Sequence, residues 1–182
     1  MKNSFAYLGP KGTFTEAAFL QMPIAQGAEL IPAESVREAL NLVRSGKVFG
    51  ALVPIENSVE GSVATTLDEL GHGDSLEIID EIAIPVEFAL LAKPGVSISD
   101  IKRIATHPHA HAQCVDWLHK NIPGVHVLPA MSTAAAAEEL SVGANYDAAI
   151  CSVAAAKHYG LEILAQGIGD SDSAWTRFVL VS

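Results

Sequence analysis

Thr176 and Arg177 stand where a polar run of the sequence passes into an apolar one. The segment D-S-D-S-A-W-T-R-F-V-L-V-S runs from Asp170 to Ser182, and its apolar end is typical of a buried strand. A hydroxyl, a guanidinium and the ring of Phe178 therefore follow one another where a loop leads into a strand. Rigid scaffolds often present reactive groups at such junctions. The alternative is that Thr176 and Arg177 only alternate between the faces of an edge strand.

A carboxylate and an amide follow the apolar strand predicted at residues 50–55. Glu56 and Asn57 lie at the carboxyl end of this strand, where open α/β sheets bind their ligands. Together they offer acceptors and donors to an acidic or hydroxylated substrate. The alternative is a turn in which Asn57 has a positive φ angle and Gly61 allows a tight approach.

Three histidines alternate in T-H-P-H-A-H-A-Q-C, the segment from Thr106 to Cys114. Pro108 and the helix predicted after it would splay the imidazoles, and no acidic or cysteine cluster has ligand spacing. We therefore predict no metal site. Thr106 and Gln113 are expected instead to reach one cleft.

Small hydroxyl residues stand at the start of several predicted helices. They occur in Gly12-Thr13, Gly61-Ser62, Ser132-Thr133 and Ser152. Free N–H groups and the positive end of the helix dipole favour anions there. Ordinary N-capping explains any single case, but the repetition predicts donors for a carboxylate-bearing ligand, with Ser132 and Thr133 among them.

The composition of the 182 residues argues against several classes of protein. The formal net charge is −10 and no cluster of Lys and Arg is present, so nucleic acid is not an expected partner. No apolar run approaches the ~20 residues that span a bilayer, and the first residues do not resemble a secretory signal. Cys114 and Cys151 lie in apolar segments and are expected to be buried thiols. The alternative of a single disulfide between them stays open at this level. These features predict a globular, cytoplasmic protein.

Strand and helix patterns alternate in two halves of the chain. Strands are predicted at residues 5–8, 28–32, 50–55, 104–106, 125–128, 148–151, 161–165 and 179–181. Helices are predicted at residues 13–21, 35–45, 63–70, 110–120, 132–140 and 154–159.

These patterns predict an α/β fold with two α/β lobes around a cleft. Residues 76–92, with a proline at 85, are expected to bend from one lobe into the other. Lobe 1 is expected at about residues 1–80 plus 166–182, and lobe 2 at about residues 81–165. The strand at 161–165 could return to the first lobe.

Four stretches give the chain a family resemblance. They are G-P-K-G-T-F-T-E from Gly9, P-I-E-N-S-V-E-G-S from Pro54, T-H-P-H-A-H-A-Q-C from Thr106 and W-T-R-F-V-L-V from Trp175. In this order they resemble the catalytic domain of prephenate dehydratase, here over residues 4–182. The resemblance implies a fold similar to type II periplasmic binding proteins and an active site between the lobes. It implies a hydro-lyase that converts prephenate to phenylpyruvate, water and CO2 in phenylalanine biosynthesis.

The resemblance also implies roles for individual residues. Thr176 would be the catalytic residue, and the substrate-binding residues would be Glu56, Asn57, Thr106, Gln113, Ser132, Thr133, Arg177 and Phe178. Thr106 keeps a hydroxyl where family members often have serine. Arg177 could bind a substrate carboxylate or be structural, and Phe178 would shape the pocket wall. No cofactor or metal is implied, and a homodimer is the expected assembly.

Several alternatives stay open at this level. Family members usually carry a C-terminal ACT regulatory domain after the catalytic lobes, whereas this sequence ends at Ser182. Either that domain was removed or this form lacks the control, and the chain could also be half of a larger bifunctional enzyme. Arogenate dehydratase is the nearest rival activity. A non-catalytic two-lobed binding protein is the rival from another class.

Overall fold

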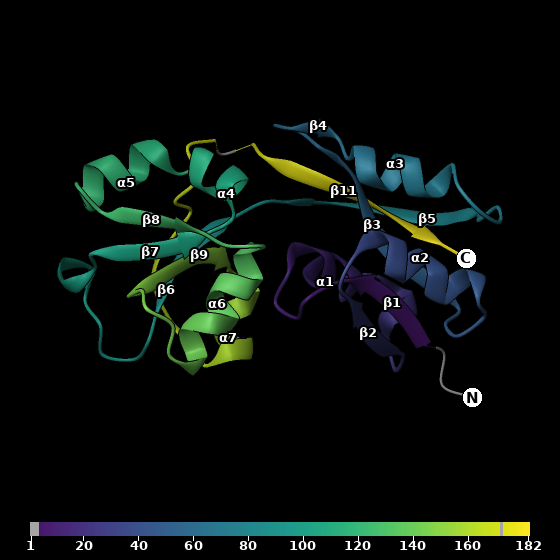
Figure 1. The fold of residues 1–182 in the computed structure, drawn as a ribbon, viewed down its shortest axis with the longest axis horizontal. Coiled ribbons are helices and arrows are strands. Elements are labelled where there is room, and N and C mark those ends of the chain that lie inside the picture. The colour runs from purple at the N-terminus through teal and green to yellow at the C-terminus, as the bar shows by residue number, and fades with distance from the viewer. Residues whose placement is uncertain (1–3, 172) are drawn as a thin grey trace. The chain divides into compact units, whose positions relative to one another are not determined.

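A computed structural model of the chain describes residues 4–171 and 173–182, which divide into two compact α/β units (Figure 1). Within the described residues, unit 1 consists of residues 4–10, 14–86 and 174–182. Unit 2 consists of residues 11–13, 87–171 and 173. Each unit has one mixed β-sheet with its own helices, so each is described separately.

Unit 1 contains six strands, three α-helices and one short 3₁₀ helix. The strands are β1 Ser4–Leu8, β2 Glu29–Ala33, β3 Gly50–Asn57, β4 Gly61–Ser62, β5 Ile78–Pro85 and β11 Trp175–Val181. The helices are α1 Phe14–Phe19, η1 Pro23–Ala25, α2 Val36–Arg44 and α3 Ala64–Leu70.

The sheet of unit 1 has the strand order β2-β1-β3-β11-β5, with β4 paired to β3. β1 is parallel to β2 and β3, whereas β11 is antiparallel to both β3 and β5. The last strand of the chain thus lies inside the sheet, between two strands from its first half. This position gives the T-R-F segment neighbours on both sides.

Helices cover both faces of this sheet, and the core residues alternate accordingly. Ala51, Val53 and Val179 pack on one face with residues of α2. Leu52 and Phe178 pack on the other face with residues of α1. The alternation follows from the two-residue period of side chains along a strand, and it sorts the site residues of β3 and β11 by face.

Unit 2 contains five strands, four α-helices and one 3₁₀ helix. The strands are β6 Phe88–Ala92, β7 Arg103–Thr106, β8 His126–Pro129, β9 Ala148–Ser152 and β10 Glu162–Gln166. The helices are η2 Ile98–Asp100, α4 Pro108–Ala112, α5 Val115–Asn121, α6 Thr133–Val142 and α7 Val153–Tyr159. The strand order is β10-β6-β9-β7-β8, and an Ala-rich core beneath α6 and α7 packs on the sheet.

Most of the predicted elements are present, and the best match is α2. Its N-cap is Ser35, whose hydroxyl accepts a hydrogen bond from the Glu38 N–H over 3.1 Å, as the capping-box pattern predicts. The chain leaves unit 1 between Val86 and Glu87, within residues 76–92, the segment expected to lead from one lobe into the other. This crossing comes later than residue 80, because β5 stays paired with β11 as far as Pro85.

Two expectations about elements are wrong. The helix predicted at residues 110–120 is broken into α4 and α5 at Gln113 and Cys114. The strand at residues 161–165 does not return to the first lobe, because β10 pairs with β6 in unit 2. The second crossing therefore falls after Ser173, past the expected position near residue 166.

Candidate active site

Thr176 and Asn57 are joined by a hydrogen bond in unit 1. Thr176 lies near the start of β11 and pairs in register with Asn57, the last residue of β3. Asn57 Nδ2 donates to Thr176 Oγ1 over 2.9 Å, and Thr176 is only 8% exposed. Because an amide NH₂ group only donates, it occupies a lone pair of the threonine oxygen. The O–H proton of Thr176 is thereby left to bond another acceptor.

The orientation of the Asn57 amide is set by the loop that follows it. Asn57 Oδ1 accepts hydrogen bonds from the backbone N–H groups of Val59, over 2.9 Å, and Glu60, over 3.0 Å. An amide whose oxygen is held in this way must turn its NH₂ group to the opposite side, toward Thr176. The expected turn is therefore present, but the positive φ angle belongs to Gly61 and not to Asn57.

A β-bulge in β3 makes this pairing possible. The register of β3 with β11 shifts by one residue at Ile55. Before the bulge, Val53 faces the core on the α2 side, and strict alternation would place Asn57 on that same face. The extra residue reverses the alternation and turns Asn57 toward Thr176, an effect typical of bulges beside functional sites.

Ser58 lies beside the candidate site and was not among the predicted site residues. Its backbone N–H donates to the Trp175 carbonyl over 2.9 Å, and its hydroxyl accepts from the Trp175 N–H over 2.9 Å. Ser58 thus holds both backbone groups of the residue before Thr176. The E-N-S motif contained this signal, because a serine after a strand end often bonds nearby backbone groups.

Arg177 lies on the opposite face of β11 from Thr176, because successive residues of a strand alternate. Its guanidinium Nη1 is 2.9 Å from Glu81 Oε1 on β5, and its Nε is 3.5 Å from Glu56 Oε2 on β3. It also lies over the Trp175 ring, 5.6 Å from the ring centroid. Arg177 therefore links three neighbouring strands, and two carboxylates already offset its charge.

Phe178 lies in the hydrophobic core of unit 1. Its side chain is 1% exposed and packs in a cluster that contains Phe5, Tyr7 and Leu180. It shares the face of Thr176, two residues earlier on β11. Phe178 supports the strand from inside the core, and its role as a pocket wall stays a prediction.

Thr106 and Gln113 lie in unit 2, seven residues apart across α4. Thr106 is fully buried at the end of β7, and its hydroxyl donates to the Ile150 carbonyl on β9 over 2.8 Å. Gln113 is half-buried at the C-terminal end of α4, and its Nε2 donates to the His109 carbonyl over 3.3 Å. Thr106 thus precedes α4 and Gln113 follows it, and the partner of each side chain lies in unit 2.

Ser132 is the N-cap of α6, and Thr133 is the first residue of that helix. The Ser132 hydroxyl accepts a hydrogen bond from the Ala135 N–H over 2.9 Å. Its own O–H can still donate, as can the remaining free N–H groups of the first turn. Both residues are half-buried.

The other expected hydroxyl positions have structural uses. Gly61 and Ser62 form β4, and α3 begins later, at Ala64, so they do not open a helix. The Ser152 hydroxyl is buried and donates to the Gly12 carbonyl over 2.6 Å. This bond helps to hold residues 11–13 in unit 2.

The three alternating histidines do not converge. His107 Nδ1 accepts from the His109 N–H over 3.3 Å and so caps α4, and the His107 and His109 rings are stacked edge to face. Within residues 4–171 and 173–182, no group of three or more His, Cys, Asp or Glu side chains could hold a metal ion. In the same residues, no helix is both long and apolar enough to cross a membrane.

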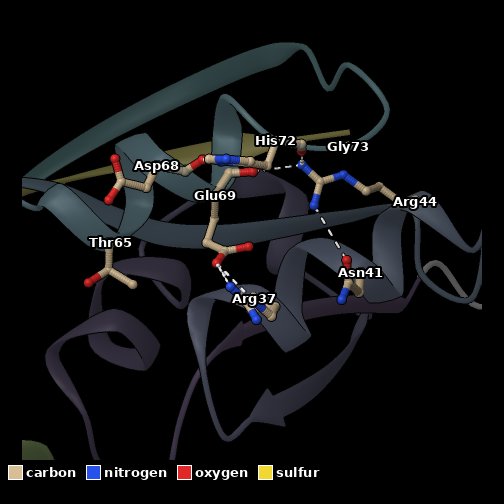
Figure 2. A pocket seen from close by; sticks show the side chains of 8 residues that line it. All are labelled: Arg37, Asn41, Arg44, Thr65, Asp68, Glu69, His72 and Gly73. Carbon is tan, nitrogen blue, oxygen red and sulfur yellow. Dashed lines mark hydrogen bonds and ion pairs between the residues drawn. The ribbon is translucent and has the colours of Figure 1, made fainter.

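A polar hollow of about 630 Å³ lies between α2 and α3, and Thr176 is not among the residues that line it (Figure 2). Arg37 Nη2 is 2.7 Å from Glu69 Oε1. Arg44 donates to the backbone carbonyls of Glu69, over 2.8 Å, and His72, over 2.6 Å. Both guanidinium groups that line the hollow thus bind α3 or the turn after it, through an ion pair for Arg37 and hydrogen bonds for Arg44.

Comparison with known proteins gives one consistent family. A family model described as prephenate dehydratase matches residues 5–182. The prephenate dehydratase of Mycobacterium leprae (strain TN) is 46% identical over 184 residues, which cover 97% of this chain and 57% of that protein. The chain thus spans somewhat more than half the length of the curated relatives that it matches.

Solved structures agree with this family and with the fold. The crystal structure of prephenate dehydratase from Arthrobacter aurescens, in complex with L-Phe, is 50% identical, with a TM-score of 0.93 over 98% of this chain and 59% of that one. GqqA, described as a novel type of quorum quenching acylase, is 31% identical, with a TM-score of 0.82 over 99% of this chain and 64% of that one.

A more distant likeness concerns the fold alone. A periplasmic substrate-binding protein of an ABC transporter from Coxiella burnetii is 15% identical, with a TM-score of 0.50 over 98% of this chain and 84% of that one. The prediction of two α/β lobes similar to those of periplasmic binding proteins is confirmed.

Proposed function

The chain belongs to the prephenate dehydratase family, and on that premise we propose that it converts prephenate to phenylpyruvate, water and CO2. The observation that carries the proposal is the hydrogen bond from Asn57 to Thr176, which leaves the threonine proton to a further acceptor. In the reaction, the bond from the ring to its carboxylate breaks, and that electron pair becomes part of the aromatic ring. The ring hydroxyl leaves from the opposite carbon and takes up one proton to become water.

Thr176 is proposed to donate its hydrogen bond to the departing hydroxyl. A threonine O–H is too weak an acid to give up its proton fully at neutral pH, so the hydroxyl stabilises the departing oxygen by preorganised hydrogen bonding, and that oxygen takes up its proton from the buffered solvent after it leaves. Formation of the aromatic ring supplies the driving force, so the chemistry requires no cofactor or metal. Asn57 holds the threonine oxygen, and Ser58 holds the backbone before it.

The partner of Thr176 also argues against a nucleophilic role. A threonine nucleophile needs a neighbouring base that takes up its proton. The Asn57 amide nitrogen donates to Thr176 and cannot accept a proton from it. The site therefore favours dehydration over the acylase activity described for GqqA.

The substrate carries two carboxylates, and unit 2 offers groups suited to them. We propose that Ser132, Thr133 and Gln113 donate hydrogen bonds to the substrate. The N-terminus of α6 adds the positive end of its dipole. Thr106 is proposed to fix the end of β7 beside them through its bond to Ile150. The side chains of Glu56 and Arg177 pair on the face of the sheet opposite Thr176, so we propose no direct contact of either with the substrate.

The activity is tested by incubating the purified chain with prephenate and following phenylpyruvate by its absorbance in alkali. Arogenate, in which an amino acid side chain replaces the pyruvyl group, is offered in parallel. Turnover of prephenate supports the proposed activity. Turnover of arogenate alone would show that the chain is an arogenate dehydratase instead. Binding of either compound without turnover would instead support a two-lobed binding protein.

We also propose that the protein works in the cytoplasm as a homodimer, as the family resemblance implies. The acidic balance of the chain, with a formal net charge of −10, suits a protein that binds neither nucleic acid nor anionic membranes. Light scattering coupled to gel filtration tests the assembly, and a monomer at micromolar concentration would contradict it.

A further inference from the structure

The break between α4 and α5 places Gln113 at the junction of two short helices in unit 2. α4 ends at Ala112 and α5 begins at Val115, so Gln113 and Cys114 lie between them. Cys114 is the N-cap of α5 and makes no side-chain capping bond, although its side chain is fully buried. Apolar residues continue through the break, so hydrophobic patterning alone would run one helix straight through it.

A continuous helix here would pair the Trp117 N–H with the Gln113 carbonyl, four residues earlier. That bond is absent, and both groups bond to Asp170 instead. Trp117 N–H donates to Asp170 Oδ1 over 3.2 Å, and the Asp170 N–H donates to the Gln113 carbonyl over 2.6 Å. Asp170 thus accepts from the donor and donates to the acceptor of the hydrogen bond that a continuous helix would form.

Asp170 also caps the start of α5 with its second carboxylate oxygen. Asp116 N–H donates to Asp170 Oδ2 over 3.2 Å. Two backbone N–H groups in the first turn of α5, which have no helical partner there, therefore donate to the same carboxylate. Its negative charge faces the positive end of the helix. The segment that carries Asp170 is itself held, because Ile168 is fully buried and its N–H donates to the Phe88 carbonyl over 3.2 Å.

We propose that Asp170 is a positioning residue of the active site, which acts by holding open the helix break that orients Gln113. The inference rests on the proposed function, in which Gln113 bonds to the substrate. Without the Asp170 carboxylate, the Trp117 N–H loses its acceptor and can pair with the Gln113 carbonyl, which has a second lone pair beside the one that accepts from the Asp170 N–H. The backbone of Gln113 then moves toward a helical conformation, and its side chain moves with it.

A double-mutant cycle tests this route. The value of kcat/KM for prephenate is measured for the wild type, Asp170→Ala, Gln113→Ala and the double variant. Asp170→Ala is expected to lower kcat/KM by about ten- to a hundredfold, the scale of a group misplaced by an ångström. In the Gln113→Ala background the same change is expected to have less than about a threefold effect, because coupled residues are not additive. Equal effects in both backgrounds would overturn the inference.

The conservative variant Asp170→Asn separates positioning from loss of the fold. Its side-chain amide keeps one oxygen acceptor, which Asp170→Ala lacks, so its kcat/KM is expected to lie between those of the wild type and Asp170→Ala. If Asp170→Ala does not fold by circular dichroism, the cycle is run with Asp170→Asn. Asp170→Asn with the activity of the wild type, together with additive effects in the cycle, would overturn the inference.

Asp116→Asn is the matched control. It removes a carboxylate from the same helix start, and the Asp116 side chain is exposed and accepts no hydrogen bond in the part of the chain that the structure describes. Its kcat/KM is expected to stay within about twofold of the wild type, as for an ordinary surface position. A loss as large as that of Asp170→Ala would attribute the effect to charge alone and overturn the inference.

Amide hydrogen exchange measured by NMR separates this inference from the proposed function. Asp170→Ala is expected to change the exchange rates at the N–H groups of Asp116 and Trp117, which lose their acceptor on Asp170, whatever the substrate. A wild-type chain without turnover of prephenate would refute the proposed function and, with it, the positioning role. An active wild type whose Asp170→Ala variant shows unchanged exchange and unchanged kcat/KM would refute the inference alone.

Discussion

Asn57 Nδ2 lies 2.9 Å from Thr176 Oγ1, and the direction of this hydrogen bond determines what the threonine can do. The Asn57 oxygen is held by two backbone N–H groups, so the amide can only present its donor to Thr176. The threonine must therefore accept from Asn57 and can donate only elsewhere. The arrangement leaves the Thr176 hydroxyl able to donate a hydrogen bond, which is the role proposed for it toward the leaving group.

Asn57→Asp is expected to abolish most of the turnover without disturbing the loop. The aspartate still accepts from the Val59 and Glu60 N–H groups, but it cannot donate to Thr176, whose O–H then turns toward the carboxylate. We expect kcat for prephenate to fall by about a hundredfold or more, the effect of losing one preorganised donor. Asn41→Asp, an exposed position on α2, serves as control. Similar kcat values for Asn57→Asp and Asn41→Asp would refute the donor argument.

Arg177→Met is expected to destabilise unit 1 modestly and to act little on substrate binding. The ion pairs of Arg177 with Glu56 and Glu81 are more than a third exposed, so each is worth about 0.2–1 kcal/mol. The contact with the Trp175 ring adds about 0.5–1 kcal/mol. Urea unfolding at low and high salt measures the loss, which should shrink with salt. A rise of KM by about a hundredfold with unchanged stability would instead make Arg177 a ligand of a substrate carboxylate.

Gly12→Ala is expected to lower the free energy of unfolding of unit 2 by about 2 kcal/mol or more. Gly12 has φ +79°, which costs an L-residue about 1–2 kcal/mol. A Cβ there would also lie 3.1 Å from Ala155 Cα and 3.2 Å from Tyr159 Cε2. Gly160→Ala is the matched control, because Gly160 has φ +66° but its Cβ would meet nothing within 4 Å. Equal losses for the two variants in urea unfolding would show that crowding contributes nothing.

The two buried thiols are expected to make the protein less stable at alkaline pH. Burial raises the pKa of Cys114 from 9.0 to about 12, with a further contribution from the charge of Asp170, and burial raises the pKa of Cys151 likewise to about 12. Above pH 9 the unfolded chain releases these protons while the folded chain keeps them, so stability falls between pH 9 and about 12. The loss approaches about 1.4 kcal/mol per pH unit for each thiol.

Urea unfolding at a series of pH values measures this slope. The double variant Cys114→Ala, Cys151→Ala should show a shallower slope above pH 9 than the wild type. An Ellman's reagent titration at pH 8 should find both thiols unreactive in the folded chain and reactive in urea. Identical slopes for wild type and double variant would contradict the burial argument.

The sequence predicted what depends on local patterns. Ser35 and Glu38 specify the start of α2 by capping, and the apolar run before Glu56 specifies β3. It could not predict the break at Gln113, because the hydrophobic pattern continues through it and the group that stabilises it, Asp170, lies more than fifty residues later.

The sequence predicted the residue types of the proposed site, but not the face of the sheet on which each side chain lies. The E-N-S and T-R-F motifs carry the residues of the proposed site. The bulge at Ile55, however, depends on the register between strands from opposite ends of the chain. Only that register shows that Asn57 and Thr176 share one face while Arg177 lies on the other. A motif written as consecutive letters carries no such information.

The most direct test of the account compares Thr176→Val with Thr176→Ser in the conversion of prephenate to phenylpyruvate. Valine keeps the shape of threonine without the hydroxyl, whereas serine keeps the hydroxyl. We predict that Thr176→Val lowers kcat by at least about a hundredfold while prephenate still binds by calorimetry, and that Thr176→Ser keeps kcat within about tenfold of the wild type. Near-normal turnover by a folded Thr176→Val variant would contradict the central claim.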